Sequence, residues 1–436
     1  MPYVVPSPPA PPGAPPPGPG RRGRWSRTVR RFAAVVALAT GAALAGPGTA
    51  EAAPAAPVVA EARAAAALER VTSFGANPGG LNMYVYRPAA LPASAPVVVA
   101  LHGCTQSAQV YSDNAGLNTF ADRHGFLVVY AETTTANNAN KCFNWFQPGD
   151  TRRGQGEAAS IRQMVAHAAT AYGADTGRVQ VTGLSAGGAM TSVMLAAYPD
   201  VFAAGAVVAG IPYGCGTDAV SAFGCMSPGV DRTPAAWAQA VRNAHPGFAG
   251  PWPRVAIWHG DNDATVAPRN ADELRDQWTA VHGLGQTPDR TSTIGPNSTR
   301  RSEYLAADGR SVVEVDRVPG IGHGTPVDPG SGAEQCGATG TQHFIDSICS
   351  GYWITRFFGL DGTTTPEPPV DPPTEPAACW TANNYEHVRA GRATTTGGQV
   401  YAKGSGQHLG LYNTFVTHTL KESPAGHYVV ADGSCP

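Results

Sequence analysis

Apolar positions between residues 53 and 360 follow two different spacings. Short apolar runs, beginning with 96–101 (PVVVAL), are typical of strands that are buried on both faces of a parallel sheet. Five further runs of this type lie at 126–131, 178–182, 204–209, 254–258 and 312–315. Helical spacing of apolar residues predicts helices at 118–124, 157–172, 186–198 and 271–281. This alternation predicts an α/β fold, in which a mostly parallel sheet carries helices on both faces.

The segment 361–378 (DGTTTPEPPVDPPTEPAA) interrupts the pattern. Because Pro, Thr and Glu cannot form a core there, we expect an extended linker. It divides the chain into a large domain at 53–360 and a small domain at 379–436. The small domain has a Cys near each end, and a core of that size usually needs such a staple.

Residues 1–52 have the features of an export signal behind a Pro-rich extension. Six Arg between positions 21 and 31 precede an apolar run at 32–45 and a small-x-small pattern at 50–52. The run is short for a bilayer span, so a membrane anchor is the less favoured alternative. Arg30 and Arg31 leave both the general and the twin-arginine export routes open. We therefore expect a secreted, extracellular protein with no membrane contact after signal cleavage.

Composition and charge narrow the class of protein further. Hydrophobic residues make up 42% of the 436 residues, which is enough for a globular core. The net charge is −2, and removal of the Arg-rich first 52 residues makes it more negative. A mildly acidic chain without a basic run is a poor nucleic-acid binder, so we expect no nucleic-acid partner. We expect a monomer.

Eight Cys follow the expected signal, at 104, 142, 215, 225, 336, 349, 379 and 435. An even number in an exported chain indicates disulfides, but eight Cys allow 105 pairings. None lies in a CxxC motif or a Cys/His cluster, so no metal site is expected.

Active-site residues of parallel α/β sheets gather at the carboxyl ends of the strands. The expected strand 178–182 leads into GLSAG at 183–187 and then a helix. This is the G-x-S-x-G motif in its strand–turn–helix setting, the nucleophile elbow of α/β-hydrolases. The glycines permit a turn too tight for side chains, and the helix N-terminus points at the developing oxyanion. Ser185 is therefore the expected nucleophile.

A serine nucleophile needs a base and an orienting acid, which follow it in the order acid, then His. The strand at 254–258 leads into HGDNDATV, where Asp263 is preferred over Asp261 because Asp261 sits at the turn itself. His323, between glycines after the last expected strand, is the expected base. His259 is the fallback, and the other histidines are expected to be structural.

The oxyanion hole needs two backbone N–H groups. We expect them from Ala186 and from Cys104, which follows the strand at 96–101. His102 then serves as a scaffold for this loop. A Cys104–Cys142 disulfide would tie the loop down and place Trp145 and Phe146 beside the cleft, where they line a substrate groove or simply pack the core. The other hypothetical pairs are Cys215–Cys225, Cys336–Cys349 and Cys379–Cys435.

The large domain resembles the extracellular short-chain-length polyhydroxyalkanoate (polyhydroxybutyrate) depolymerases and related esterases. The resemblance rests on the motifs LHGCTQS (101–107), CFNWFQPGD (142–150), RRGQGEAASIRQMV (152–165), GLSAGGAMTSVM (183–194), IPYGC (211–215), WHGDNDATV (258–266) and IGHGTPVD (321–328). It implies that Ser185, Asp263 and His323 form a catalytic triad. Feruloyl and acetylxylan esterases have similar motifs, so they remain the alternative.

The C-terminal segment is similar to terminal domains attached to such depolymerases. It carries aromatic residues, among them Trp380 and Tyr412, but no catalytic constellation. These aromatics either adsorb to an insoluble polymer or form the core of the small domain. Together these features predict a secreted serine esterase that acts on an insoluble polyester, or on a polysaccharide ester, without a metal or organic cofactor. A non-catalytic binding protein is disfavoured because the triad is complete.

Overall fold

The computed structural model describes residues 68–362, 379–422 and 426–433. The expected signal at 1–52, residues 363–378 of the expected linker and Cys435 lie outside the described residues. The two folded parts, 68–362 and 379–433, are described separately below. None of the helices in the described part of the chain is long and apolar enough to cross a membrane.

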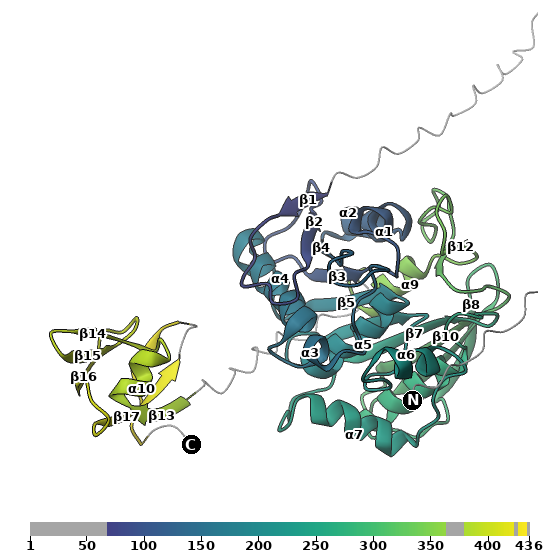
Figure 1. Cartoon of the computed structure of the whole chain (residues 1–436). Coiled ribbons are helices and arrows are strands. Elements are labelled where there is room, and N and C mark those ends of the chain that lie inside the picture. Colours follow the sequence, from purple (N-terminus) through teal and green to yellow (C-terminus); the bar gives the residue numbers. More distant parts are fainter. Residues whose placement is uncertain (1–67, 363–378, 423–425, 434–436) are drawn as a thin grey trace, which may run out of the picture. The chain divides into compact units, whose positions relative to one another are not determined.

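A ten-stranded sheet runs through the described part of the large domain (Figure 1). Its strands lie in the order β1 (Glu69–Val71), β2 (Asn82–Tyr86), β4 (Leu127–Glu132), β3 (Val97–Leu101), β5 (Val179–Leu184), β6 (Ala204–Val208), β7 (Arg254–Gly260), β10 (Ser311–Val318), β9 (Thr299–Leu305) and β8 (Arg290–Ile294). The six strands from β4 to β10 are parallel, whereas β1 and β2 at one edge and β9 and β8 at the other are antiparallel.

All six strands expected from the sequence are confirmed, and they are the six parallel strands. The antiparallel edges were not predicted. β8 (RTSTI) is exposed over most of its length and carries no apolar run, because an edge strand packs on fewer neighbours. The parallel sheet with its helices is an α/β-hydrolase fold.

Helices cover both faces of this sheet, as expected. One face packs against α4 (Gly156–Tyr172), α5 (Ala186–Ala197), α7 (Pro234–Ala244) and α8 (Arg269–Val281). The other packs against α1 (Ala108–Asn114), α2 (Leu117–His124) and α9 (Ser350–Phe357). The alternation of β3 shows the division, since Val97, Val99 and Leu101 join the first core and Val98 and Ala100 the second.

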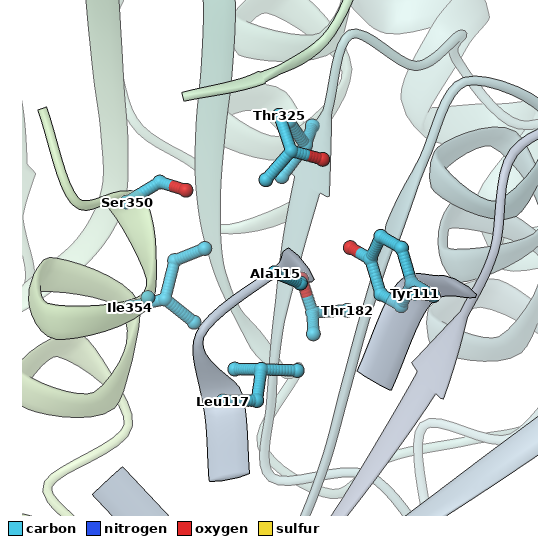
Figure 2. A pocket seen from close by; sticks show the side chains of 9 residues that line it. Tyr111, Ala115, Leu117, Thr182, Thr325, Ser350 and Ile354 are labelled. Atoms are coloured by element: carbon cyan, nitrogen blue, oxygen red, sulfur yellow. The ribbon is translucent and has the colours of Figure 1, made fainter. Parts of the chain in front are cut away.

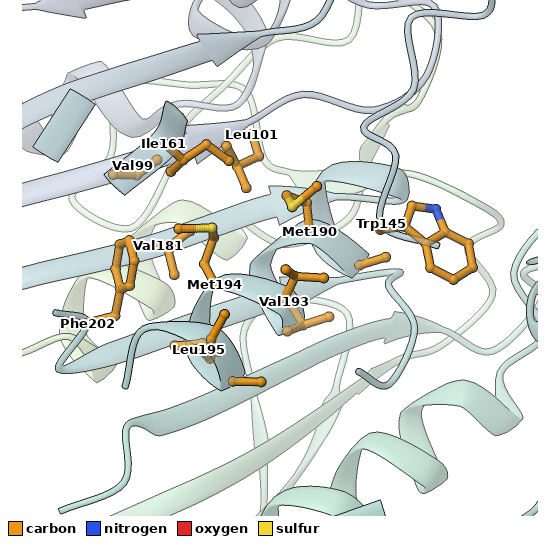
Figure 3. Close-up of a cluster of buried hydrophobic side chains, with 14 of the residues drawn as sticks. Val99, Leu101, Trp145, Ile161, Val181, Met190, Val193, Met194, Leu195 and Phe202 are labelled. Carbon is orange, nitrogen blue, oxygen red and sulfur yellow. The ribbon is translucent and has the colours of Figure 1, made fainter. Parts of the chain in front are cut away.

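Helix α5 is enclosed on all sides, and each of its twelve residues is buried. Figure 3 shows Met190, Val193 and Met194 of this helix against Val181 and Leu101 of the sheet. Leu195 packs over Gly205 of β6, where a Cβ would lie 2.6 Å from a Leu195 methyl carbon. This dense packing holds the N-terminus of α5, and therefore the preceding turn, in one position.

Three disulfides are present in the large domain, and they are the three expected there: Cys104–Cys142, Cys215–Cys225 and Cys336–Cys349. Cys379 is also disulfide-bonded. Its expected partner, Cys435, lies outside the described residues. The large domain extends slightly past residue 360, since the Asp361 carboxylate lies 3.3 Å from the Arg356 guanidinium.

The small domain contains two three-stranded sheets around one short helix. Strands β13 (Cys379–Asn383), β17 (Thr417–Glu422) and β18 (Tyr428–Val430) form the first sheet, and β14 (Ala393–Thr396), β15 (Gln399–Ala402) and β16 (His408–Leu411) the second. Helix α10 (Asn384–Arg389) joins them. The core consists of Ala393, Val400, Ala402, Leu409 and Leu420, so it is made of small and aliphatic side chains.

We expect Leu195→Ala to destabilise the protein by about 2–5 kcal/mol, because it removes buried methyl groups and leaves a cavity above Gly205. Urea unfolding measures this free energy. Val220→Ala, on a side chain that is 83% exposed, is the control and should stay within about 0.5 kcal/mol of the unaltered protein. Equal stabilities for the two variants would contradict the description of α5 as the packed centre of the domain.

Candidate active site

The chain turns sharply at Ser185, between β5 and α5. Ser185 has φ 58° and ψ −118°, a conformation that costs a non-glycine residue about 1–3 kcal/mol. Its N–H donates to the Val208 carbonyl oxygen at 2.9 Å, and its own carbonyl oxygen accepts from Ala189 N–H at 2.8 Å. These bonds and the buried α5 hold the strained turn, which is the nucleophile elbow that the GLSAG motif predicts.

Glycines around the elbow bring two backbone segments into direct contact. A Cβ at Gly187 would overlap the carbonyl oxygens of Leu101 and His102, and one at Gly183 would lie 2.5 Å from the Gly187 carbonyl oxygen. Only glycine allows this approach. The N-terminus of α5 therefore lies against the end of β3, where the loop with Cys104 begins.

Asp263 and His323 form a hydrogen-bonded pair at this edge of the sheet. His323 Nδ1 and Asp263 Oδ2 are 2.7 Å apart, and both side chains are more than nine-tenths buried. Asp263 follows β7 and His323 follows β10, which pair in parallel so that Gly260 lies opposite Val318. Ser185 follows β5, two strands from β7 in the same parallel set. The three expected residues thus all leave the same edge.

Several donors converge on the Asp263 carboxylate. Its Oδ1 accepts the N–H groups of Thr265 and Val266, each at 2.9 Å, and His259 Nε2 lies 3.4 Å from its Oδ2. Burial by itself would raise the pKa of Asp263, but the hydrogen bonds from His259, His323 and Val266 outweigh burial and hold the pKa well below its usual range. The carboxylate is therefore ionised when it holds the His323 ring.

The loops that carry the acid and the imidazole are joined along their backbones. Asp261 N–H donates to the Val318 carbonyl oxygen and Asn262 N–H to that of Ile321, both at 3.0 Å. A Cβ at Gly260 would lie 2.5 Å from the Ile321 oxygen, so Gly260 permits this approach. Beyond the imidazole, His343 Nδ1 donates to the His323 carbonyl oxygen at 3.1 Å. The position of the His323 ring is thus fixed from two sides.

The two acids and the two histidines between which the sequence left a choice have different hydrogen-bond partners. Asp261 accepts from Arg300 at 2.7 Å and Arg317 at 3.3 Å. His259 lies 2.8 Å, through Nε2, from the Val266 carbonyl oxygen. Since an oxygen can only accept, Nε2 carries the proton. His259 therefore supports the acid loop and does not occupy the place of the base.

The N–H groups on either side of Cys104, in the loop after β3, are both engaged within the protein. Gly103 N–H donates to Gln106 Oε1 at 2.9 Å and Thr105 N–H to the Asn140 carbonyl oxygen at 2.7 Å. Among the described residues, the N–H groups of Cys104 and Ala186 have no protein partner. They are the two donors expected for an oxyanion hole.

His102 is buried beneath this loop. Thr133 N–H donates to its Nε2 at 3.1 Å, so Nδ1 carries the proton and donates to the Gly103 carbonyl oxygen at 2.7 Å. Burial lowers the pKa of His102, although the bond to Gly103 acts in the opposite direction. A neutral ring with both nitrogens engaged is a scaffold, as the sequence predicts for this residue.

A buried carboxyl group holds the loop that follows Cys142. Glu157 at the start of α4 is fully buried, and its two oxygens accept from Asn144 N–H at 2.7 Å and Asn144 Nδ2 at 3.2 Å. Burial raises the pKa of Glu157 to about 8, against the effect of the Asn144 bonds and with a contribution from the Asp150 charge. Through the Cys104–Cys142 disulfide, this clamp extends to the loop of Cys104.

The aromatic residues after Cys142 differ in exposure. Trp145 is 7% exposed and belongs to the first core, at the margin of the cluster in Figure 3. Phe146 is only partly buried and meets Trp145 edge-on, with ring centroids 5.3 Å apart. Phe146 therefore offers more surface for a ligand than Trp145, which mainly packs the core.

A small cavity lies between Tyr111, Thr182 and Thr325 (Figure 2). Its volume of about 10 Å³ is close to the minimum for one water molecule. The Thr325 hydroxyl has no hydrogen-bond partner among the described residues. The cavity can accommodate a water molecule but not an acyl group.

The three residues expected as nucleophile, acid and base lie at one edge of the sheet, but the sequence did not predict all of the groups that support them. It gave His259 only as a fallback base and overlooked Glu157 and His343. Glu157 lies in a motif that carried the family resemblance, yet nothing in its neighbouring residues indicates a carboxylate buried against Asn144. Among the described residues there is no group of three or more His, Cys, Asp or Glu that could hold a metal ion.

The raised pKa of Glu157 predicts a pH-dependent difference in stability. Between the ordinary pKa near 4.5 and the folded-state pKa of about 8, the folded state holds one more proton than the unfolded state. Stability from this group is therefore present at pH 5 and lost as the pH rises through 8, by up to about 1.4 kcal/mol per pH unit. Glu157→Gln removes the proton and should flatten this slope.

Urea unfolding of the protein and of Glu157→Gln between pH 5 and 8.5 measures the difference. Glu334→Gln, which changes an exposed carboxyl group, is the matched control and should retain the slope of the unaltered protein. Parallel pH profiles for the protein and Glu157→Gln would show that Glu157 does not titrate in this range.

Comparison with known proteins agrees with this geometry. Residues 81–298 match the family model described as esterase PHB depolymerase. The chain is 52% identical to poly(3-hydroxyalkanoate) depolymerase C of Paucimonas lemoignei over 296 residues, which cover 68% of this chain and 71% of that protein. It is 39% identical to an acetylxylan esterase of Coprinopsis cinerea over 264 residues, which cover 59% of this chain and 69% of that protein.

Two further proteins are similar to this chain. Feruloyl esterase B of Talaromyces stipitatus is 36% identical, over 63% of this chain and 77% of that protein. Among solved structures, an acetyl xylan esterase from Aspergillus awamori superposes with a TM-score of 0.57 at 29% identity, covering 67% of this chain and 99% of that chain. The chain is therefore a carboxylic ester hydrolase with the α/β-hydrolase fold, and it belongs to the PHB depolymerase family of esterases.

Proposed function

We propose that the protein is a secreted serine esterase that hydrolyses short-chain polyhydroxyalkanoates such as poly(3-hydroxybutyrate), with Ser185, Asp263 and His323 as its catalytic triad. The observation that carries the mechanism is the 2.7 Å bond between His323 Nδ1 and Asp263 Oδ2, at the sheet edge where the elbow presents Ser185. An ionised acid, an imidazole and a serine in this chain order are the parts of an acyl-transfer site.

In the proposed reaction, His323 Nε2 removes the Ser185 hydroxyl proton while Oγ attacks the ester carbonyl carbon. The tetrahedral intermediate collapses as His323 returns the proton to the departing alcohol oxygen, which leaves an acyl-enzyme. A water molecule, deprotonated by His323, then attacks the acyl carbon. His323 returns that proton to Ser185 Oγ as the acid leaves, which restores the free enzyme. Asp263 keeps the proton of the ring on Nδ1, so that Nε2 can act as the base.

The negative charge on the former carbonyl oxygen is stabilised by the N–H groups of Cys104 and Ala186. Both lack other protein partners among the described residues, and their segments are in contact at Gly187. Donors fixed before the reaction stabilise the developing charge without reorganisation in the transition state. The Cys104–Cys142 disulfide, together with Glu157 and Asn144, supports one of the two donors.

The preference for a polyester rests on relatedness. The Paucimonas lemoignei protein, named as a depolymerase of poly(3-hydroxyalkanoate), is 52% identical to this chain, compared with 39% for the acetylxylan esterase and 36% for feruloyl esterase B. A feruloyl or acetylxylan esterase is the second candidate function, because these enzymes have the same family motifs. Secretion is supported by the export-signal pattern at 1–52 and by the disulfides.

The small domain is proposed to hold the enzyme on its insoluble substrate. Tyr385 and Tyr412 are each about two-fifths exposed, with ring centroids 5.7 Å apart, and Phe415 is 89% exposed. Trp380, which was also expected to bind substrate, is half-buried beside Tyr428 and under the Arg392 guanidinium. Tyr412 is therefore a stronger candidate for polymer contact than Trp380.

We expect the purified protein to clear a suspension of poly(3-hydroxybutyrate) and to release little ferulate or acetate from plant cell-wall substrates. Ser185→Ala should lower kcat on every ester by roughly 10⁴–10⁶-fold, because no nucleophile remains. Turbidity and product release measure the two activities. Full hydrolysis by Ser185→Ala would reject the mechanism, and activity confined to feruloyl or acetyl esters would favour the second candidate.

Asp263→Asn should lower kcat by about 10³–10⁴-fold with little change in KM, because an amide neither selects the Nδ1–H tautomer nor stabilises the imidazolium. Asp261→Asn is the matched control, since this acid lies two residues away and bonds to Arg300 and Arg317. Hydrolysis of a soluble short-chain ester gives both parameters. A larger loss in Asp261→Asn than in Asp263→Asn would transfer the acid role to Asp261.

A further inference from the structure

We propose that the outer face of α6 (Ala219–Met226) is a second polymer-contact surface, through which the catalytic domain itself binds an uncharged aliphatic polyester. This inference rests on the proposed function. Val220 is 83% exposed and Phe223 is 71% exposed. They are one helical turn apart and so share a face of α6. In the described part of the catalytic domain they are the two large hydrophobic side chains that lie open to solvent.

The inner face of α6 is firmly attached, which makes the exposure of the outer face a fixed feature. Ala222 and Cys225 are buried, and Cys225 is bonded to Cys215. At the N-terminus, Ser221 N–H donates to Asp218 Oδ1 at 2.8 Å and Asp218 N–H donates to Ser221 Oγ at 3.1 Å. A pre-ordered helix loses little conformational entropy when it binds, so even a small apolar surface contributes to adsorption.

The location of α6 connects it with the candidate active site. It follows β6, whose last residue, Val208, pairs with Leu184 next to Ser185. At its C-terminus, the Met226 carbonyl oxygen accepts from Ala267 N–H at 2.8 Å, in the loop that carries Asp263. A polymer segment adsorbed on α6 would thus be close to the edge where hydrolysis takes place.

The chemistry of the surface favours an uncharged partner. The stretch 219–230 (AVSAFGCMSPGV) contains no charged side chain. Methyl and methylene groups of an aliphatic polyester fit such a face, and Asp218, just before it, uses its carboxylate to cap α6. A second copy of the chain fits less well, because one Phe and one Val supply far less than the roughly 800 Å² per partner of a stable interface. We therefore assign this face to binding of the polyester surface.

The test uses full-length chain carrying Ser185→Ala, so that adsorption is measured without hydrolysis. Val220→Ser with Phe223→Ser is compared with Val220→Leu with Phe223→Leu, which keeps the face apolar. Both pairs are also placed in a Tyr385→Ser, Tyr412→Ser, Phe415→Ser background, which removes the exposed aromatic surface of the small domain. We expect the Ser pair to weaken binding to poly(3-hydroxybutyrate) particles by about tenfold in each background and the Leu pair to leave it unchanged.

With Ser185 restored, the Ser pair should hydrolyse soluble p-nitrophenyl butyrate at the unaltered rate but need about tenfold more particle surface for half-maximal clearing. Unchanged adsorption of the Ser pair would overturn the proposal. So would an equal loss on the soluble ester, which would mean that α6 shapes the site. A dimer that the Ser pair converts to monomer in sedimentation would show that a second copy covers the face.

These outcomes are separable from failure of the proposed function. If the protein hydrolyses soluble esters but never clears the polymer, the proposed polyester hydrolysis is rejected independently of the role of α6. The adsorption measurement on the Ser185→Ala chain still decides whether α6 binds the polymer surface.

Discussion

The close backbone contact between the end of β3 and the start of α5 is the constraint on which the site depends. It exists because Gly187 and Gly183 leave no side chain between the strand and the helix. It places Ser185 in its strained turn and brings the loop of Cys104 next to Ala186. The other parts of the site add to this contact, since the acid and imidazole loops approach the same edge from β7 and β10. A side chain at Gly187 would separate the two proposed oxyanion donors as well as distort the elbow.

The sequence predicted those features of the fold and the site that depend on residues close together in the chain. The six parallel strands were visible because strands buried on both faces are continuous apolar runs. The elbow was visible in the sequence because its tight turn requires glycines at fixed positions on both sides of the serine. The chain order of acid and imidazole then limited the choice to Asp263 or Asp261 and to His323 or His259. Hydrogen bonds in the structure show what each of these residues contacts, and a linear pattern does not contain them.

Other features depend on contacts between residues far apart in the chain. The pairing of Glu157 with Asn144 brings a carboxyl group into the core. The local sequence alone would instead place this carboxyl group on the exposed surface of a helix. The edge strands β8 and β9 carry mostly polar residues, so no apolar period marks them. In the small domain, exposure separates Tyr412 and Phe415 from the half-buried Trp380, yet all three are aromatic residues in a short, polar segment. Composition could indicate an aromatic surface but not which rings form it.

The Cys104–Cys142 disulfide makes the order of this loop depend on the redox state of its surroundings. In a reducing environment, the loop that bears the Cys104 N–H would lack its covalent tether, and only the Glu157 clamp and neighbouring backbone bonds would restrain it. Oxidising surroundings would therefore favour the ordered loop over the loose one.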